Sequence, residues 1–216
     1  MNIVVYTANI GKRDAPRTAA ELKGIRQISH KRFPRCPVVT ARCIKTLSHL
    51  FVPDADVSIW IDFNVFLNKP PEAFVEMLGA CDIGAFARYP ADETKTAYDE
   101  GWAVRHRDGE QRMTEQLAAY QASGFEGGTV ISSSVLVRRH TPEVVRFNEA
   151  WWAQLSRHTM RDQVSFPYVV DRTGVTVAYW PNVNLGGKGE YYDRRYHGPD
   201  EHGNRRWRDK RRKKHG

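Results

Sequence analysis

Residues 57–67 read Val-Ser-Ile-Trp-Ile-Asp-Phe-Asn-Val-Phe-Leu. Ser58 is the only polar residue of this run before Asp62, and a breaker with Pro53 and two aspartates precedes it. A short, β-branched and aromatic run of this kind predicts a strand buried on both faces. Because an unpaired buried carboxylate is costly, we expect Asp62 at the carboxyl end of the strand, where a ligand or metal compensates its charge. From these residues alone, an aspartate that caps the following turn is an equally good interpretation.

The chain contains 216 residues, 41% of them hydrophobic, which is enough for one sizeable core and short for two domains. Its three cysteines follow no C-x-x-C spacing, so they argue for a reducing compartment and against a zinc site. No stretch approaches the roughly 20 apolar residues of a membrane span, and the first residues lack the basic region and cleavage site of a signal peptide. We therefore expect a soluble, cytoplasmic protein with no membrane partner.

The positive charge is unevenly distributed along the chain. The formal net charge is +8, and residues 194–216, with ten basic and three acidic residues, carry +7 of it, which leaves +1 for the rest. The basic signal therefore belongs to an appendage of the fold. We expect one folded domain over residues 1–198 and a basic, flexible tail over residues 199–216.

Hydrophobic patterning predicts that strands alternate with helices. Strands are expected at residues 2–7, 38–40, 57–67, 82–87, 130–137 (as one strand or a pair) and 175–179. Helices are expected at residues 18–32, 41–51, 71–78, 92–105, 110–123, 142–156 and from Asp162 to a break near Pro167. This alternation predicts an α/β fold whose central, mostly parallel sheet is flanked by helices. The loop after the first strand carries no glycine-rich phosphate motif, so a nucleotide would be held by other groups.

Three polar groups are candidates for one site: Asp62 with Asn64, Asp162 with Gln163, and His197. An Asp-x-Asn pair after a buried strand offers hard oxygen ligands to Mg²⁺ or Mn²⁺, and imidazole is a suitable further ligand for Mn²⁺. On spacing alone, other interpretations stay open. His197 is equally well a surface histidine, and Asp162 a helix-start residue stabilised by the helix dipole.

Several short motifs occur in a fixed order along the chain. They are Tyr6-Thr7-Ala8-Asn9-Ile10-Gly11, Arg42-x-x-Lys45, Ser58-Ile59-Trp60-Ile61-Asp62-x-Asn64, Val137-Arg138-Arg139-His140, Phe147-Asn148-x-x-Trp151-Trp152, Arg161-Asp162-Gln163-x-Ser165-Phe166 and Tyr196-His197-Gly198. Over roughly residues 2–198, this set resembles the GT-A glycosyltransferase family typified by plant pollen-turgor and seed-mucilage proteins. It is more distantly similar to the glycogenin-like retaining transferases. The resemblance implies a GT-A, Rossmann-like fold and the transfer of a sugar from a nucleotide sugar.

The resemblance also implies a metal site. Asp62 and Asn64 stand where GT-A enzymes keep their Asp-x-Asp motif, and His197 stands where glycogenin-like enzymes place a metal-ligating histidine. The implied cofactor is Mn²⁺ or Mg²⁺. Two departures bear on this site: Asn64 replaces the second aspartate of the general motif, and Phe63 occupies a position that is usually small in the family.

The same resemblance implies positions for the donor. Tyr6, Thr7 and Asn9 would line the nucleoside pocket. Arg42, Lys45 and Asp62 would face the donor phosphate or sugar, and Asp162 with Gln163 would contact the sugar near the reacting carbon. The leading hypothesis is therefore a metal-dependent glycosyltransferase that moves a sugar from a nucleotide-sugar donor, UDP-linked by resemblance, to an acceptor hydroxyl.

The tail suggests an acceptor. Residues 204–214 interleave one tryptophan with a dense run of Lys and Arg, a pattern typical of an arm that follows phosphates. We expect Arg205, Arg206, Trp207 and Arg208 to contact a polyanionic acceptor, with a hydroxylated base in DNA as the preferred candidate. A solubilising tail is an equally good interpretation. The alternatives are a protein or glycan acceptor, nucleotidyl transfer, and an inactive nucleic-acid-binding protein with a transferase-like fold.

Overall fold

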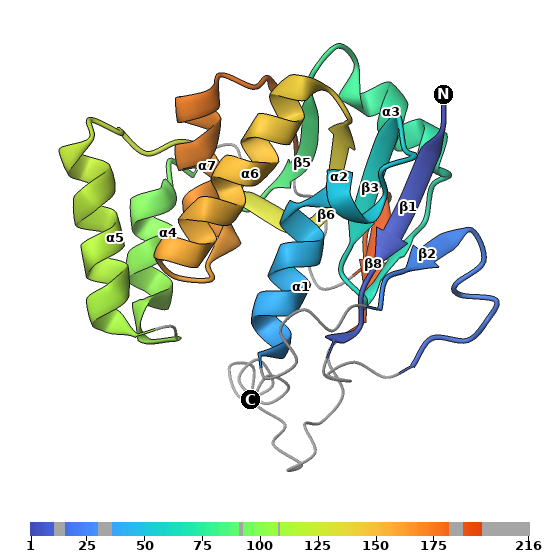
Figure 1. Ribbon diagram of the computed structural model, residues 1–216, viewed down its shortest axis with the longest axis horizontal. Coiled ribbons are helices and arrows are strands. Elements are labelled where there is room, and N and C mark those ends of the chain that lie inside the picture. Colours follow the sequence, from blue (N-terminus) through green and yellow to red (C-terminus); the bar gives the residue numbers. More distant parts are fainter. Residues whose placement is uncertain (11–15, 30–35, 91–92, 108, 182–187, 196–216) are drawn as a thin grey trace, which may run out of the picture.

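The computed structural model describes residues 1–10, 16–29, 36–90, 93–107, 109–181 and 188–195 (Figure 1). These residues form a six-stranded sheet in the order β2-β1-β3-β6-β5-β7. Its strands are β1 (Ile3–Thr7), β2 (Ile25–Gln27), β3 (Val57–Ile61), β5 (Ile83–Ala87), β6 (Ile131–Arg139) and β7 (Val177–Trp180). Because β6 alone pairs antiparallel with its neighbours, five of these strands run in one direction. The predicted mostly parallel sheet is confirmed.

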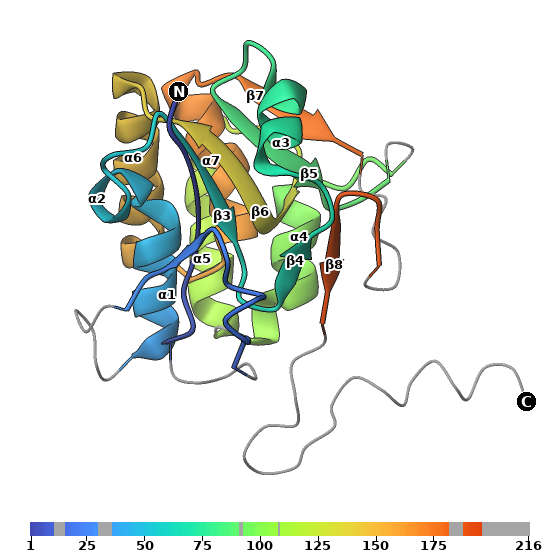
Figure 2. The same cartoon turned by 90° about the vertical axis from the view of Figure 1, so that its right-hand side faces the viewer.

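Helices cover the sheet on both faces (Figure 2). They are α1 (Pro37–Thr46), α2 (Ser48–Phe51), α3 (Pro71–Leu78), α4 (Ala97–Val104), α5 (Glu110–Ala122), α6 (Pro142–Arg157) and α7 (Asp162–Thr173), with a 3₁₀ turn, η2 (Arg105–Arg107), after α4. On one face, α1, α6 and α7 pack against a buried cluster that includes Tyr6 and Trp60. On the other face lie α3 and a two-stranded antiparallel sheet of β4 (Val65–Leu67) and β8 (Tyr192–Arg194).

The strand β3 shows why residues 57–67 direct the fold. All five of its residues are buried, and alternate side chains enter the two apolar clusters on opposite faces of the sheet. The strand ends at Ile61, and Val65 N donates a 2.8 Å hydrogen bond to Asp62 O as the chain turns away. The expected single strand is therefore divided into β3 and β4, and Asp62 lies at the predicted exit.

The helix α6 follows its sequence pattern closely. The Thr141 side chain accepts a 3.3 Å hydrogen bond from Val144 N, and Pro142 occupies the first turn, where its missing N–H costs nothing. The apolar side chains at helical spacing, Val144, Phe147, Trp151 and Leu155, are buried against the sheet.

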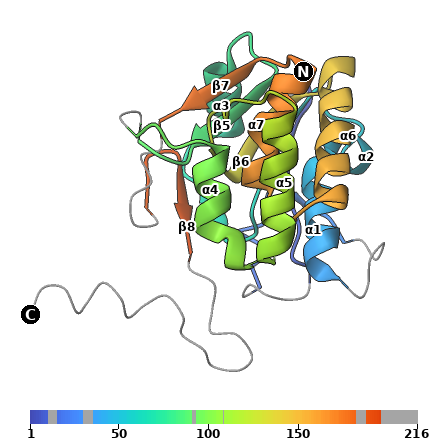
Figure 3. The same ribbon diagram turned by 90° about the vertical axis from the view of Figure 1, so that its left-hand side faces the viewer.

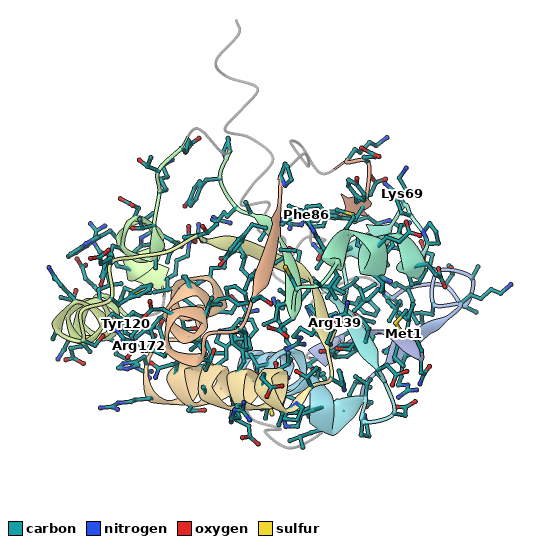
Figure 4. The ribbon with its side chains drawn as sticks, turned by 90° about the horizontal axis from the view of Figure 1, so that it is seen from above. Met1, Lys69, Phe86, Tyr120, Arg139 and Arg172 are labelled. Atoms are coloured by element: carbon teal, nitrogen blue, oxygen red, sulfur yellow. The ribbon has the colours of Figure 1, made fainter. Side chains whose placement is uncertain are left out.

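A separate lobe of α4 and α5 packs beside α7 (Figure 3). Its apolar cluster includes Met113, Leu117 and Tyr120 of α5. Tyr120 stacks on Tyr168 of α7 with ring centroids 3.8 Å apart, and Figure 4 shows Tyr120 beside Arg172, also from α7. This packing anchors the lobe whose η2 turn reaches the site described below.

Further expectations about local structure were wrong, and the helix expected at residues 41–51 is divided into α1 and α2 at Leu47. Residues 18–24 form turns and Ile25–Gln27 is an edge strand, because the apolar residues of this stretch are too few to bury a helix face. Residues 38–40 belong to α1, which begins at Pro37 and buries Cys43 and Ile44 on its core face. The helix α7 continues through the buried Pro167 to Thr173, because packing in the core outweighs the lost backbone bond.

The tail from residue 199 and His197 lie outside the described residues, so the expected domain boundary stays a prediction. None of the described helices is long and apolar enough to cross a membrane.

Candidate active site

A cleft of about 270 Å³ opens where β3 ends. Because β6 runs antiparallel to β3, its first residues lie beside that end, and Asp62 N donates a 2.8 Å hydrogen bond to Ser134 O. The η2 turn and β8 complete the wall. We call it the arginine cleft, and it is lined by Arg42, Asp62, Asn64, Arg88, Arg107, Ser132, Ser133, Ser134, Asp162, Gln163 and Arg194.

Asp162 is the most heavily bonded acid of the cleft. It is the first residue of α7 and only 1% exposed. Its Oδ2 accepts hydrogen bonds from Arg42 Nη1 at 2.8 Å, Lys45 Nζ at 2.8 Å and Ser133 Oγ at 2.7 Å. Burial alone raises the pKa of Asp162, but the charges of Arg42 and Lys45 and the hydrogen bonds from Lys45 and Ser133 outweigh it and hold that pKa well below its usual range. Asp162 is therefore an anion at physiological pH and a weak proton acceptor.

Lys45 joins the two acids of the cleft. Its side chain is 1% exposed, and its Nζ lies 2.8 Å from Asp162 Oδ2 and 3.5 Å from Asp62 Oδ1. A third contact, 2.9 Å long, goes to Ser133 Oγ. One ammonium group thus links the end of β3 to the start of α7, and the buried charge is matched by two carboxylates.

Asp62 and Asn64 form the mouth of the cleft at the end of β3. The Asp62 side chain is 36% exposed, and its Oδ1 accepts a 2.9 Å hydrogen bond from Trp60 Nε1. Asn64 is 7% exposed and donates from Nδ2 to Arg195 O at 2.7 Å, while Arg195 N donates to Asn64 O at 2.8 Å. Its amide nitrogen is thus committed to the backbone, and its side-chain oxygen is the atom suited to a ligand.

The oxygen donors of Asp62 and Asn64 fit a hard divalent cation that takes its other ligands from phosphate and water. Among the described residues, no group of three His, Cys, Asp or Glu side chains is placed to hold a metal ion. His197, the predicted third ligand, lies outside these residues, two positions after Arg195.

Not every predicted donor residue lies at the cleft. Tyr6 and Thr7 are fully buried, and the Tyr6 hydroxyl accepts a 2.6 Å hydrogen bond from Arg138 Nη2. Asn9 is half-buried and also lies outside the cleft lining. The side chains of Tyr6 and Thr7 are therefore part of the core, because β1 directs Tyr6 toward the helices, and their place in a nucleoside pocket stays a prediction.

Arg138 has a structural role behind the cleft. It is fully buried and donates to the carbonyls of Lys45 at 2.6 Å and Thr46 at 3.0 Å, near the end of α1. A cation at a helix C-terminus satisfies carbonyls that have no partner within the helix. Arg138 and Tyr6 thus fix the backbone that carries Lys45.

The sequence analysis missed six residues of the cleft. Three are successive serines of β6 whose hydroxyls face arginines and acids; Arg194 Nη2 donates to Ser132 Oγ at 3.3 Å and also to Ser134 Oγ. A run of three hydroxyl residues near the start of a buried strand was the available signal. The missed arginines gave no such signal because they come from separate parts of the chain, and they are Arg88, Arg107 and Arg194.

Positive charge dominates the arginine cleft. Of the described residues, four arginines and two carboxylates line it, with Lys45 behind them. Arginine presents planar, bidentate donors that match phosphate oxygens. The cleft is therefore suited to a diphosphate, although the chain lacks a glycine-rich phosphate loop.

The fold is the GT-A fold of glycosyltransferases. A glycosyltransferase involved in the glycosylation of the major capsid of PBCV-1 has a similar crystal structure, with a TM-score of 0.54 and 10% sequence identity over 86% of this chain and 84% of that one. Apo mouse xyloside xylosyltransferase 1 overlaps more weakly, with a TM-score of 0.39 and 13% identity over 83% of this chain and 84% of that one. No curated protein matches the sequence.

The family follows from the sequence itself. Residues 25–185, more than half of the chain, match the TOD1/MUCI70, glycosyltransferase-like domain. The chain belongs to this family, and the resemblance inferred from the ordered motifs is confirmed. At 10% identity the structural neighbours support the fold alone.

Proposed function

We propose that the arginine cleft binds a nucleotide sugar, UDP-linked, and that the protein transfers its sugar to an acceptor hydroxyl. The observation that carries this proposal is the meeting, in one cleft, of Asp62 and Asn64 at the end of β3 with Asp162 and its paired cations. A diphosphate leaving group needs positive charge, and the anomeric carbon needs a fixed anion nearby.

The arginines would hold the donor phosphates. Arg194 is oriented by hydroxyls of β6, and Arg88 by a 2.8 Å hydrogen bond from its Nε to Glu100 Oε2. Donors held in this way change little when the negative charge of the departing diphosphate develops. Asp62 and Asn64, with His197 as the predicted further ligand, would hold a Mg²⁺ or Mn²⁺ ion, which as a Lewis acid stabilises that charge.

The proposed reaction exchanges one bond at the anomeric carbon. The acceptor oxygen bonds to this carbon, and its bond to the diphosphate oxygen breaks with the electron pair leaving on the diphosphate. Asp162 is a poor base because three donors already bond its Oδ2. We therefore assign the acceptor proton to the departing diphosphate, and to Asp162 the electrostatic stabilisation of positive charge on the sugar.

The test is donor hydrolysis in the absence of an acceptor. A panel of nucleotide sugars is incubated with the full chain and Mn²⁺ or Mg²⁺, and released nucleoside diphosphate is measured. We expect slow hydrolysis of a UDP-linked sugar, lost in excess chelator and in Asp62→Ala. Asp171→Ala, which removes an exposed carboxylate from α7, is the matched control. Full activity with chelator or in Asp62→Ala contradicts the metal site, and pyrophosphate release indicates nucleotidyl transfer.

The acceptor proposal rests on the basic tail. Arg205, Arg206, Trp207 and Arg208 lie outside the described residues, and a hydroxylated base in DNA stays the predicted acceptor. Binding of duplex DNA is measured across a salt series with and without residues 204–216. We expect the affinity to fall steeply with salt and the truncation to reduce this slope. A flat salt series contradicts the DNA acceptor and leaves the donor chemistry standing.

We also propose a cytoplasmic location. Its support is that the three cysteines are free, with Cys36 exposed. Recovery of the native protein in a secreted fraction contradicts it.

A further inference from the structure

A second cavity of about 580 Å³ opens at the carboxyl ends of β5 and β7. It lies within the size range of roughly 300–1,000 Å³ usual for small-molecule sites. Aromatic rings from β7 and from the segment after β5 contribute to it, and hydroxyl residues supply polar groups. We call it the aromatic pocket, and the residues used below are Tyr89, Glu93, Lys95, Thr129, Tyr179 and Trp180.

The aromatic pocket shares a wall with the arginine cleft. Where the chain leaves β5, Ala87 and Tyr89 line the pocket, while Arg88 between them lines the cleft. At the start of β6, Val130 lines the pocket and Ser132 lines the cleft. The two segments remain paired there, since Arg88 N donates a 2.8 Å hydrogen bond to Val130 O.

One buried carboxylate fixes both sides of this wall. Glu100 of α4 is 1% exposed, and its Oε2 accepts from Arg88 Nε and from the Tyr89 hydroxyl. The arginine of one cavity and the aromatic ring of the other are thus oriented by the same atom. Two ligands bound side by side would meet across this wall.

The charges in the aromatic pocket cancel. Glu93 and Lys95 form a 2.6 Å ion pair, and Lys95 Nζ lies 4.8 Å from the centre of the Tyr89 ring. Tyr179 is 39% exposed, whereas Trp180 is 6% exposed and packs on Phe86, so Tyr179 offers the more accessible ring. A pocket of this composition suits a flat, uncharged group, in contrast to the diphosphate that suits the arginine cleft.

We propose that the aromatic pocket is the acceptor site and holds a hydroxylated nucleobase turned out of DNA, with its hydroxyl directed toward the neighbouring arginine cleft. This inference rests on the proposed function. A base taken out of the stack loses stacking energy, which an aromatic side chain restores. Residues 194–216, which carry +7 of the net charge of +8, favour a polyanion as the carrier of that neutral ring, and the half-exposed Lys95 is placed to meet a flanking phosphate.

In the reaction, the oxygen of the base hydroxyl bonds to the anomeric carbon of the donor. The carbon–oxygen bond to the diphosphate breaks, the electron pair leaves on the diphosphate, and the hydroxyl proton follows it. No oxidant or further reactant is needed.

The first experiment measures how donor turnover divides between transfer and hydrolysis. DNA that carries a hydroxymethylated pyrimidine is incubated with UDP-sugar, and glycosylated nucleosides and free sugar are quantified by mass. In Tyr179→Ala we expect the ratio of transfer to hydrolysis to fall about tenfold or more, because an aromatic stacking partner is lost. Tyr179→Phe keeps the ring and should keep the ratio. Trp102→Ala removes an exposed aromatic residue outside both cavities and is the control.

The second experiment needs no turnover. Binding of two single-stranded oligonucleotides is compared, one with the hydroxymethylated base and one with an abasic site at the same position. The intact chain should prefer the base about fivefold or more, and Tyr179→Ala and Tyr89→Ala should reduce that preference.

The outcomes separate this inference from the function beneath it. Suppose that the donor is hydrolysed and that both alanine variants keep the wild-type transfer to DNA and the wild-type base preference. That result overturns the pocket assignment and leaves the donor function. Transfer to oligosaccharides alone, lowered in Tyr179→Ala, shows that the pocket takes a sugar and overturns the nucleobase. Absence of donor hydrolysis with every metal overturns the proposed function, and equal binding of base and abasic strands then overturns the pocket as well.

Discussion

The arginine cleft and the aromatic pocket lie at the same edge of the sheet but differ in charge. Four arginines and two acids line the cleft. In the pocket, Glu93 and Lys95 neutralise each other, and aromatic rings form part of the lining. Part of this difference arises in the bend after β5, where neighbouring residues line different cavities. Tyr89 and Arg88 illustrate this: one step along the chain separates a ring in the pocket from a cation in the cleft. A sheet edge can therefore keep a charged donor and a neutral acceptor in contact without mixing their environments.

The largest effect is expected at the anion of the cleft. Asp162→Asn should lower turnover by about a hundredfold or more and change donor affinity by only a few-fold, because a charge near the anomeric carbon acts chiefly in the transition state. Steady-state rates beside calorimetric binding of the donor test this. Asp171→Asn, in the same helix but exposed, should behave as wild type. Equal losses in affinity and turnover would make Asp162 a positioning residue.

The same substitution should change how the free energy of unfolding falls at acidic pH. Because the pKa of Asp162 is held below its usual range in the folded state, its contribution is fully present above about pH 4 and is lost as the pH falls through the folded pKa. Asp162→Asn should lower the free energy of unfolding by about 3 kcal/mol near neutrality, since Lys45 loses a buried partner, and should flatten its decline in acid.

Urea unfolding of wild type and Asp162→Asn from about pH 6 to about pH 3 measures this dependence. Asp171→Asn should keep the wild-type slope. If the free energy of unfolding of Asp162→Asn falls with acid as steeply as that of wild type, other carboxylates account for the loss of stability. The exposed Asp54, whose pKa is lowered, is one of them.

A smaller but broader effect is expected where the two cavities share a support. Glu100→Gln removes the charge that orients Arg88 and Tyr89, so we expect a rise in the donor KM and a loss of base preference together, each about threefold to tenfold. The matched control is Glu110→Gln, because Glu110 also accepts from an arginine Nε, at 2.9 Å, but lies exposed. A change confined to one cavity would contradict the shared support.

The sequence predicted the parts of this arrangement that are contiguous. The apolar run of β3 and the carboxylate after it are neighbours, so Asp62 could be placed at the strand's end from eleven residues. The ordered motifs also assigned Arg42, Lys45 and Asp162 to the donor, and the structure brings all three within hydrogen-bond distance. The family and the fold followed from the same motifs.

What the sequence could not predict depends on contacts between distant segments. Arg88, Arg107 and Arg194 meet only because β5, η2 and β8 end at the same place, and scattered arginines show no pattern along a chain. Tyr6 shows the same dependence: a tyrosine near the end of a first strand suits a ligand pocket equally well as the core, and a hydrogen bond from Arg138, 132 positions away, holds its side chain in the core. The aromatic pocket was missed because its rings come from β7 and from the segment after β5, about 90 residues apart in the sequence.

The smallest effect should come from the ion pair of the aromatic pocket. Glu93→Gln leaves Lys95 unpaired and gives the pocket a net positive charge. Both side chains are 40% or more exposed, and solvent screens such pairs, so stability should hardly change. If the bound group is an uncharged ring, its affinity should change by no more than about threefold, and the preference for base over abasic strand should persist. Lys95→Gln, which leaves Glu93 unpaired, should likewise keep the preference while weakening both strands equally if Lys95 meets a flanking phosphate. A large gain in affinity for the base in Glu93→Gln would mean that the pocket receives an anion, and the charge difference between the two cavities would then no longer separate donor from acceptor.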